Sequence, residues 1–352
     1  MESAPLSPAT DRPIFVVGSM GSGTTLMRLV LDSHEHLAIA QETGFARAVL
    51  ANKWIPYWKH GGEWYGRLGM TDADLNAELR RTYGGMFQRF AEQQGKQRWG
   101  DKTPWHLWHM KMLSEVWPEA SFVGTLRHPG AVASSQHNRF GWDWRRSVRH
   151  WVRSNIEMAW MGSQLGDRFV IARYEDYVLD LESTIRPLLS WLGEPWSPLV
   201  LEHHVVQAGR GTSTAVEGHS RADDPVDPAR ATKWLDTMDS EGWRELRKQT
   251  TDLCELFGYS LDEPARLAPL GEDSPAPMQG PELAKRVDEF AGRIDWHHRP
   301  KPIAADLPLK NPPSRPGVGK GKATQPTSRE AARTLLAAAR RKVRRATSRF
   351  SS

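Results

Sequence analysis

The sequence contains a single cysteine, Cys254, among its 352 residues. One thiol cannot form an internal disulfide, so disulfide-stabilised folds are excluded and a reducing compartment is favoured. The chain also lacks an apolar run approaching the roughly 20 residues that a membrane-spanning helix needs. Its first residues, MESAPLSPATDR, have neither the basic start nor the apolar core of a secretory signal. We therefore expect a soluble, cytoplasmic protein.

Most of the chain also lacks excess positive charge. Residues 300–352 hold 13 Lys and Arg against two acidic residues, whereas the rest of the chain holds 34 basic and 40 acidic residues. The formal net charge of +5 therefore comes from the C-terminal tail, and the body is mildly acidic. This distribution argues against a general nucleic-acid-binding protein, and we expect no specific nucleic-acid partner.

Shifts in composition predict the domain organisation. We expect a disordered N-terminus over residues 1–12, one catalytic domain over 13–262, a Pro/Gly-rich linker with a short helix over 263–327, and a basic helical tail over 328–352. The tail is interpreted first as a solvated, disordered appendage. Weak contact with an anionic membrane through 328–349 is the second interpretation, and nucleic-acid contact is the third. The oligomeric state is not predicted.

Buried strands alternate with helical patterns along the body of the chain. Apolar, β-branched runs that end at glycine, proline or polar residues predict strands within 13–19, 120–130 and 168–178. Amphipathic patterns between and after these runs predict helices. This alternation favours an α/β fold of the P-loop type, in which a parallel sheet flanked by helices makes three layers.

The stretch FVVGSMGSGTTLMRLVLDSH, residues 15–34, is similar to a nucleotide-binding P-loop without its lysine. Gly18, Gly23 and Thr25 have the required spacing, but Thr24 occupies the lysine position. A strand precedes the loop and a helix follows it, and free N–H groups at a helix N-terminus bind anions. The stretch therefore predicts a phosphate site, with a purely structural Gly-rich turn as the alternative.

A second phosphate site is predicted where the strand in FVGTLRHPG ends in Arg127. Arginine can grip a phosphate with two parallel hydrogen bonds. Hydrolysis of a nucleoside triphosphate needs the loop lysine and an acidic residue at this strand end, and neither is visible. A P-loop kinase or NTPase is therefore only the alternative interpretation. Two phosphate sites without an evident metal site favour a ligand that carries phosphates in two places.

The motif order resembles sulfotransferases that use 3′-phosphoadenosine 5′-phosphosulfate (PAPS), especially tyrosylprotein sulfotransferases and their bacterial relatives. The resemblance runs from about residue 14 to residue 259. It implies transfer of a sulfuryl group from PAPS to a hydroxyl or amine by in-line displacement, with no metal required. The loop is similar to G-x-P-R-S-G-T-T-L, which implies that the 5′-phosphosulfate is bound by Ser19, Gly21, Ser22, Gly23, Thr24 and Thr25.

The loop departs from that pattern at Met20-Gly21, where relatives have Pro-Arg. A cation that would stabilise the transferring group is therefore missing. Either Arg28 or Lys102 replaces it, or the activity is low. A homologue that binds PAPS but is catalytically impaired is a further alternative.

The resemblance also assigns two catalytic residues. In LAIAQETGF it implies that Glu42 is the general base, a role that contributes about 10²–10⁴ in rate. In WGDKTPWHL it implies that Lys102 faces the oxygen bridging phosphate and sulfate, where a cation stabilises the leaving phosphate. The alternatives are a helix-capping or salt-bridged surface glutamate and an ordinary surface lysine.

The remaining cofactor residues also follow from the resemblance. LRHPGAVASSQHNR is similar to the 3′-phosphate site, which implies Arg127, Ser135 and Arg139 as ligands. Tyr174 in RYEDYV is expected to contact the nucleotide, whereas the adjacent Glu175 and Asp176 are interpreted as structural. In the late loop HSRADDPVDPARATKW, the resemblance implies that Ser220 and Lys233 close over the cofactor.

The acceptor is not predicted by the sequence. A small molecule, a glycan, a lipid or a peptide remains open. Aromatic residues within 54–65 and 99–108 are expected either to line an acceptor pocket or to belong to the core, since both environments favour aromatic rings.

Overall fold

A computed structural model describes residues 12–52, 65–209, 224–270 and 275–296. The predictions for Ser220, for the N-terminus over 1–11 and for the basic tail lie outside these described residues. The chain divides into two units, 1–308 and 309–352, and every described residue belongs to the first. Within the described residues, no helix is both long enough and apolar enough to cross a membrane.

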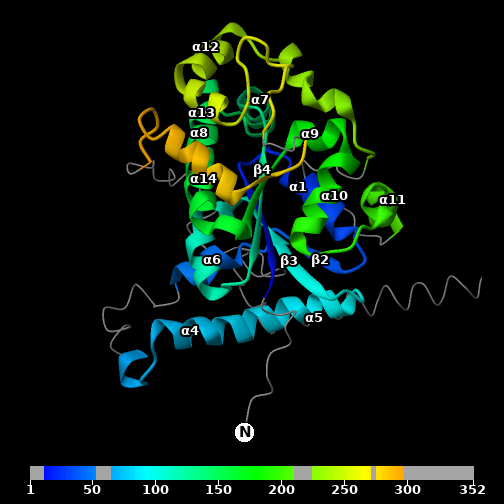
Figure 1. Cartoon of the computed structure of the whole chain (residues 1–352), viewed down its shortest axis with the longest axis vertical. Coiled ribbons are helices and arrows are strands. Elements are labelled where there is room, and N and C mark those ends of the chain that lie inside the picture. The colour runs from blue at the N-terminus through cyan, green and yellow to red at the C-terminus, as the bar shows by residue number, and fades with distance from the viewer. Residues whose placement is uncertain (1–11, 53–64, 210–223, 271–274, 297–352) are drawn as a thin grey trace, which may run out of the picture. The chain divides into compact units, whose positions relative to one another are not determined.

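A six-stranded sheet forms the centre of the fold (Figure 1). Its order is β2-β3-β1-β4-β5-β6, and all neighbouring pairs are parallel except β5 and β6. The strands are β1 (Ile14–Gly18), β2 (Leu37–Gln41), β3 (Arg98–Lys102), β4 (Ser121–Leu126), β5 (Phe169–Arg173) and β6 (Met278–Gln279). The predicted α/β fold with a largely parallel sheet is confirmed.

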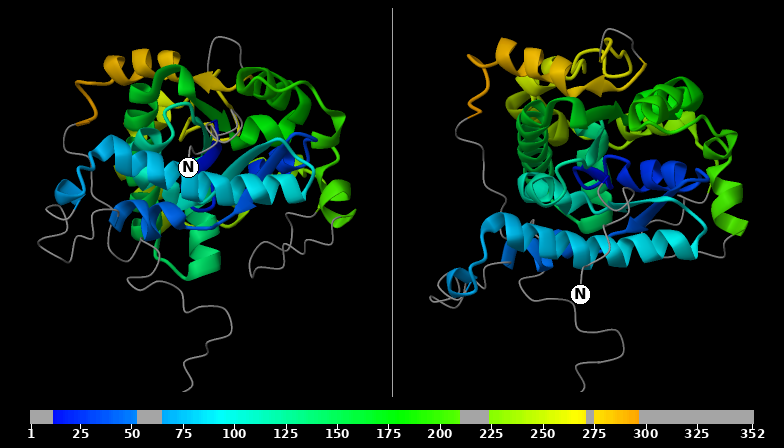
Figure 2. Two further views of the ribbon diagram at one scale, coloured as in Figure 1. Left: turned by 90° about the horizontal axis from the view of Figure 1, so that it is seen from below. Right: turned by 60° about the horizontal axis from the view of Figure 1, so that its bottom comes forward.

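Helices cover both faces of this sheet (Figure 2). Strand β1 is buried on both sides because its side chains alternate: Ile14 and Val16 join one apolar cluster, and Phe15 and Val17 join the other. The α-helices are α1 (Thr24–Asp32), α2 (Phe45–Ala48), α4 (Asp72–Leu79), α5 (Gly85–Gln93), α6 (Met110–Val116), α7 (Pro129–Phe140), α8 (Trp144–Leu165), α9 (Tyr174–Leu179), α10 (Leu181–Leu192), α11 (His203–Gly209), α12 (Ser240–Gln249), α13 (Thr251–Leu256) and α14 (Gly280–Glu289).

Short helical turns connect several of these elements. A π-helical segment, η3 (Arg80–Gly84), joins α4 to α5. The 3₁₀ segments are η2 (Leu50–Asn52), η4 (Pro104–His109), η5 (Gly166–Arg168), η6 (Pro198–Val200), η7 (Pro228–Ala231) and η8 (Lys233–Asp236).

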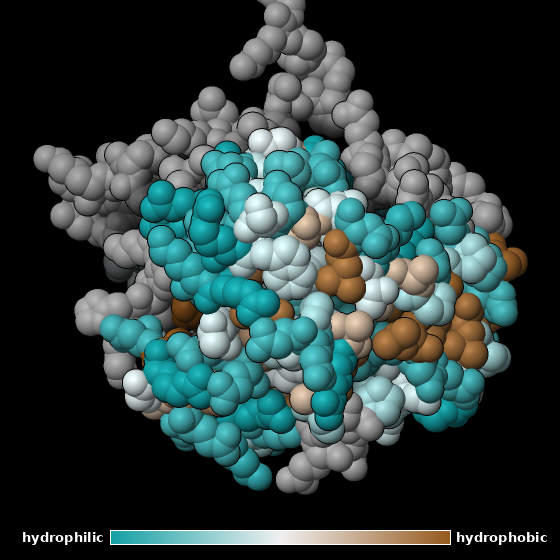
Figure 3. Space-filling model, turned by 90° about the horizontal axis from the view of Figure 1, so that it is seen from above, coloured by the Kyte–Doolittle hydropathy of each residue, from teal (hydrophilic) through white to brown (hydrophobic). Residues whose placement is uncertain are grey.

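The parallel strands bring the predicted site residues to one edge of the sheet. In such sheets, ligands bind outside the carboxyl ends of the strands. The β1–α1 loop leaves this edge, Glu42 follows β2, Lys102 ends β3, and Arg127 and Tyr174 follow β4 and β5. Figure 3 views the molecule from the side of these carboxyl ends, where hydrophilic residues predominate around separate apolar patches.

The domain boundary expected at residue 262 is too early. Strand β6 pairs antiparallel with β5, with Met278 opposite Ile171, and therefore extends the sheet. Leu283 and Val287 of α14 are buried in the same apolar cluster as Ile171. The Pro/Gly-rich composition that suggested a linker describes only the connections, because the few apolar residues between them are enough to pack this segment on the sheet.

Candidate active site

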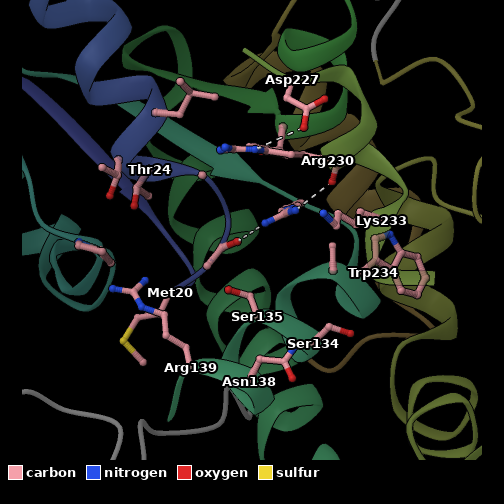
Figure 4. A pocket seen from close by; sticks show the side chains of 18 of the residues that line it. Met20, Thr24, Ser134, Ser135, Asn138, Arg139, Asp227, Arg230, Lys233 and Trp234 are labelled. Atoms are coloured by element: carbon pink, nitrogen blue, oxygen red, sulfur yellow. Dashed lines mark hydrogen bonds and ion pairs between the residues drawn. The ribbon is translucent and has the colours of Figure 1, made fainter. Parts of the chain in front are cut away.

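A cavity of about 690 Å³ opens at the carboxyl edge of the sheet. The β1–α1 loop borders it on one side and η7 and η8 border it on the other, with α7 between them (Figure 4). The predicted site residues that line it are Gly21, Gly23, Thr24, Thr25, Glu42, Arg127, Ser135, Arg139, Tyr174 and Lys233. The structure therefore brings together ten residues that the sequence analysis assigned to one ligand.

The β1–α1 loop lies against its neighbours too closely for side chains at two glycines. Gly23, the N-cap of α1, has a φ of 96°, and a Cβ there would lie 2.3 Å from atoms of Tyr174 and Tyr177. Gly21 has a φ of 90°, and a Cβ there would lie 3.1 Å from Ser135 Oγ. Glycine is required at such positions because its backbone tolerates positive φ. The loop backbone is thereby held against α7 and α9.

The side chains of Ser19 and Ser22 point away from the cavity. Ser19 Oγ lies 3.2 Å from His150 Nδ1, and Ser22 Oγ lies 2.8 Å from Thr125 Oγ1. Both serines are almost fully buried. The assignment of Ser19 and Ser22 to the 5′-phosphosulfate stays a prediction, and their hydroxyls already have partners within the protein. These two hydroxyls fix the loop from behind, because each is already engaged in the protein interior.

Two buried residues extend this support behind the loop. Gln136 Nε2 donates to Met20 O at 2.7 Å and to His150 Nδ1 at 3.1 Å. Burial, together with the neighbouring guanidinium groups of Arg146 and Arg153, lowers the pKa of His150 to about 4. His150 is consequently neutral at neutral pH, and its Nδ1 can accept a hydrogen bond.

Lys102 connects the two predicted catalytic residues with the loop. Its ammonium donates to the Glu42 carboxylate and, at 3.2 Å, to Thr25 Oγ1. The Lys102 side chain is fully buried, whereas 41% of the Glu42 side chain is exposed. Burial lowers the pKa of Lys102, and the attraction of Glu42 opposes that shift. Glu42 is therefore neither an isolated surface group nor a helix cap. It is the exposed member of an ion pair whose other member, Lys102, is buried.

Arg127 links the loop to the other side of the cavity. Its Nη1 donates to Gly21 O and its Nη2 donates to Arg230 O, both at 3.1 Å. The guanidinium also lies 4.1 Å above the centre of the Tyr174 ring. Such stacking fixes the plane of the guanidinium and adds a favourable cation–π contact.

Ser135 and Arg139 both belong to α7 and both line the cavity, as their spacing predicted. Residues four apart lie on the same face of a helix. Ser135 Oγ faces the loop at Gly21, and Arg139 lies over the ring of Phe140 at 5.3 Å. Their roles toward a 3′-phosphate stay a prediction.

The late loop is anchored by Trp234. Its ring stacks on His128 with 4.4 Å between centroids, and it covers Gly130 so closely that a Cβ there would lie 2.1 Å from the ring. Burial lowers the pKa of His128 to about 3, so this ring is neutral. Lys233, the preceding residue, is exposed and lines the cavity. Ser220, the other predicted residue of this loop, lies outside the described residues.

Glu175 and Asp176 are structural, as expected. Glu175 accepts hydrogen bonds from His128 N at 2.9 Å and from the Tyr259 hydroxyl at 2.8 Å. Asp176 accepts two hydrogen bonds from Arg173, at 2.9 and 3.0 Å. Neither carboxylate lines the cavity, and the bond from His128 N to Glu175 holds the β4 and β5 ends together.

Sequence analysis missed Arg230 and did not decide the role of Trp105. Arg230 lines the cavity, and its guanidinium lies 3.7 Å from Asp224 and 3.9 Å from Asp227. Trp105 also lines the cavity, whereas Trp99 is fully buried in the core. The 99–108 segment therefore contributes both to the core and to the cavity lining, and its contact with an acceptor stays a prediction. The only available signal for Arg230 was its position three residues before Lys233.

One group of described residues has ligand atoms grouped as in a metal site, namely His34, His36 and Glu194. Both ring nitrogens of His34 are already engaged, because Nδ1 accepts from His36 N at 3.0 Å and Nε2 lies 2.8 Å from Pro195 O. His34 and His36 also precede β2, at the end of the sheet away from the cavity, and Glu194 follows α10. Their geometry is that of a structural clamp.

Comparison with known proteins identifies the family. A model of the Sulfotransferase family matches residues 13–198, slightly more than half of the chain. Protein-tyrosine sulfotransferase 1 of Danio rerio is 28% identical over 272 residues, which are 73% of this chain and 75% of that protein. Protein-tyrosine sulfotransferase 2 of Gallus gallus is 28% identical over 238 residues, or 63% of this chain and 62% of that protein.

Solved structures of the same description are also similar. The sulfotransferase domain from the Synechococcus PCC 7002 olefin synthase aligns with a TM-score of 0.49 and 19% identity, over 70% of this chain and 98% of that chain. The family match itself begins at the residue before β1 and continues beyond α10. It therefore covers the loop, Glu42, Lys102, Arg127 and α7. The chain belongs to the sulfotransferase family and is a sulfotransferase enzyme.

Proposed function

We propose that the enzyme transfers a sulfuryl group from PAPS to an acceptor hydroxyl. The observation that carries this proposal is the meeting of two anion-binding features in one cavity. The N-terminus of α1 and its loop form the first, and Arg127 with the α7 residues Ser135 and Arg139 forms the second. PAPS carries anionic groups on both its 5′ and 3′ positions, so it requires two such features.

In the proposed reaction, the acceptor oxygen attacks the sulfur and the bond from sulfur to the 5′-phosphate oxygen breaks. The products are the sulfated acceptor and 3′,5′-adenosine bisphosphate. Glu42 takes the proton of the acceptor hydroxyl, and Lys102 stabilises the charge that develops on the leaving phosphate. Both residues are suited to these roles because they adjoin each other beside Thr25. Protein cations supply the charge stabilisation, so the proposed step requires no metal.

For the acceptor, we propose a phenolic hydroxyl carried by a peptide. The similar proteins of Danio rerio and Gallus gallus are named protein-tyrosine sulfotransferases. In this chain, Met20, Pro104, Trp105 and Phe140 line the same cavity as Glu42. Apolar and aromatic side chains suit an aromatic acceptor better than a glycan, because a glycan demands many hydrogen-bonding partners.

Calorimetric titration tests the donor. We expect the purified full-length protein to bind 3′,5′-adenosine bisphosphate without added metal, and more tightly than 5′-AMP. Arg127→Ala should remove most of this preference. Arg186→Ala is the matched control, because Arg186 also lies over an aromatic ring, that of Trp196, but does not line the cavity.

The proposal is wrong if the wild-type protein shows no preference for the bisphosphate over 5′-AMP. Binding only of ATP with Mg²⁺ would favour the kinase or NTPase alternative. Tight binding of the bisphosphate without transfer to any tyrosine peptide would instead favour an impaired homologue, in keeping with the missing cation at Gly21.

A further inference from the structure

Glu42 has an unusual backbone conformation. Its φ is 45°, and it is the only described residue other than glycine with a positive φ. Such conformations are strained, and they persist only where the surroundings hold them. This conformation turns the chain sharply after β2, and Gly44, also left-handed with a φ of 64°, completes the turn. Glu42 is both strained and next to Lys102, so specific contacts must hold it in this position.

Besides the Lys102–Glu42 ion pair, three hydrogen bonds join this turn to the residues at the end of β3. Glu42 N donates to Lys102 O at 2.7 Å, and Gly44 N donates to Thr103 Oγ1 at 3.3 Å. Between them, the Thr43 hydroxyl donates to Asp101 Oδ2. Apart from the Lys102–Glu42 ion pair, only the Thr43 contact joins the turn to a charged side chain.

Asp101 is itself held rigidly. It is fully buried, and its Oδ1 accepts a hydrogen bond from the Thr103 hydroxyl at 2.9 Å. His106 Nε2 lies 3.4 Å from its Oδ2, and the His106 ring meets the rings of Phe15 and Phe45 edge to face. A buried carboxylate is costly unless hydrogen bonds satisfy it, so both hydroxyl groups that it binds are strongly held in turn.

We propose that Asp101 is a positioning residue that acts through Thr43 to hold the Glu42 carboxylate against Lys102 at the edge of the cavity. The catalytic meaning of this arrangement rests on the proposed function, in which Glu42 is the general base. Asp101 and Lys102 are consecutive residues of β3, so one strand end fixes both partners of the pair. Lys102 is held by its own burial, and Glu42 is held by the Asp101–Thr43 bond.

The Lys102 amine reports directly on this arrangement. Glu42 raises the pKa of Lys102 against the effect of burial. If Glu42 moves away, the pKa of Lys102 must therefore fall. We would label the full-length protein with ¹³Cε-lysine, assign the Lys102 signal with Lys102→Arg, and titrate that signal by NMR. Glu42→Gln gives the value expected when the pairing is lost completely.

The decisive variant is Thr43→Val. Thr43 is exposed, so this change of nearly constant size should leave the fold intact. We expect it to shift the pKa of Lys102 at least halfway toward the Glu42→Gln value. Thr43→Ser keeps the hydroxyl and should retain the wild-type value. Asp101→Asn should act like Thr43→Val, and Thr43→Val remains informative if that buried substitution prevents folding.

The inference is overturned if Thr43→Val leaves the Lys102 titration at the wild-type value, or if Thr43→Ser shifts it equally. A contact that only stabilised the fold would change the unfolding midpoint without moving this signal. The binding of 3′,5′-adenosine bisphosphate keeps the two proposals separate. If the wild-type protein does not bind it, the proposed function fails, whereas the Lys102 titration still decides whether Asp101 and Thr43 hold Glu42.

Discussion

Lys102 donates hydrogen bonds to Glu42 and to Thr25, so one buried cation connects the predicted base with the first turn of α1. The ammonium of Lys102 balances the negative charge of the Glu42 carboxylate. A bound phosphosulfate would offer the same ammonium a second anionic partner, and hydrogen bonds to ionised groups are about twice as strong as neutral ones. In the proposed function, the Glu42 carboxylate takes a proton from an acceptor that still carries one.

Replacement of Glu42 should therefore affect acceptors according to their acidity. With a tyrosine peptide, whose phenol has a pKa of about 10, Glu42→Gln should lower kcat by about 10²–10⁴. With 4-nitrophenol at mildly alkaline pH, most of the acceptor is already ionised, and the loss should be much smaller. Steady-state transfer of labelled sulfate from PAPS measures both rates. Equal losses for the two acceptors would contradict a role for Glu42 as the base.

Restoring the family arginine in the loop should weaken the site. Gly21 has a φ of 90°, and a Cβ there would approach Ser135 Oγ to 3.1 Å. A left-handed backbone costs a residue with a side chain roughly 1–2 kcal/mol, so Gly21→Arg should weaken binding of 3′,5′-adenosine bisphosphate about tenfold. Met20→Arg is the control, because the backbone of Met20 is not left-handed. Tighter binding by Gly21→Arg in calorimetry would show that the missing charge outweighs the strain.

Local sequence patterns predicted the parts of the site that depend on short spacings. The strand–loop–helix around Gly18 and Gly23 follows from residues within one stretch, and so does the pairing of Ser135 with Arg139 on one helix. The carboxyl ends of parallel strands then had to meet at one edge, which brought Arg127 to the loop. These features needed only periodicity, glycine placement and the geometry of parallel sheets.

The contacts that sequence reasoning missed join residues far apart in the chain. Ser19 and Ser22 bond to His150 and Thr125, which are 131 and 103 residues away. No local pattern distinguishes a serine that faces a ligand from one that faces the core. Strand β6 was missed for a different reason. It is two residues long and lies among Pro-rich segments, so its place is set by contacts with the distant β5 and the core rather than by a local pattern.

A side chain at position 130, under the Trp234 ring, should disturb donor binding. A Cβ on Gly130 would lie 2.1 Å from the Trp234 ring, so Gly130→Ala must displace the ring and with it Lys233. We expect at least a tenfold loss of affinity for 3′,5′-adenosine bisphosphate by calorimetry. Gly85→Ala is the control, since a Cβ there meets no atom within 4 Å, and it should be neutral or stabilise the fold by about 0.4–1 kcal/mol. Unchanged affinity in Gly130→Ala would show that Trp234 does not anchor this side of the cavity.

Acid should destabilise the protein through its buried histidines. The pKa of His150 is about 4 in the folded protein and about 6.5 when exposed, so between these values the unfolded chain binds a proton that the folded chain does not. The free energy of unfolding must therefore decrease as the pH falls through this range, by an amount on the order of 3 kcal/mol for His150 alone. His128, with a pKa of about 3, acts in the same direction.

Urea unfolding from neutral pH down to about pH 4 measures this dependence, and His150→Gln separates the contribution of one residue. In this variant, the slope of the unfolding free energy against pH should decrease by the equivalent of nearly one bound proton. The contribution of His128 to that slope should remain. An unchanged slope would mean that His150 is accessible to water and titrates normally in the folded state. The result also bears on the loop: protonation of His150 Nδ1 in the folded protein would remove the acceptor that binds Gln136 and faces Ser19, so donor affinity should decline only as the pH approaches the folded-state pKa of about 4.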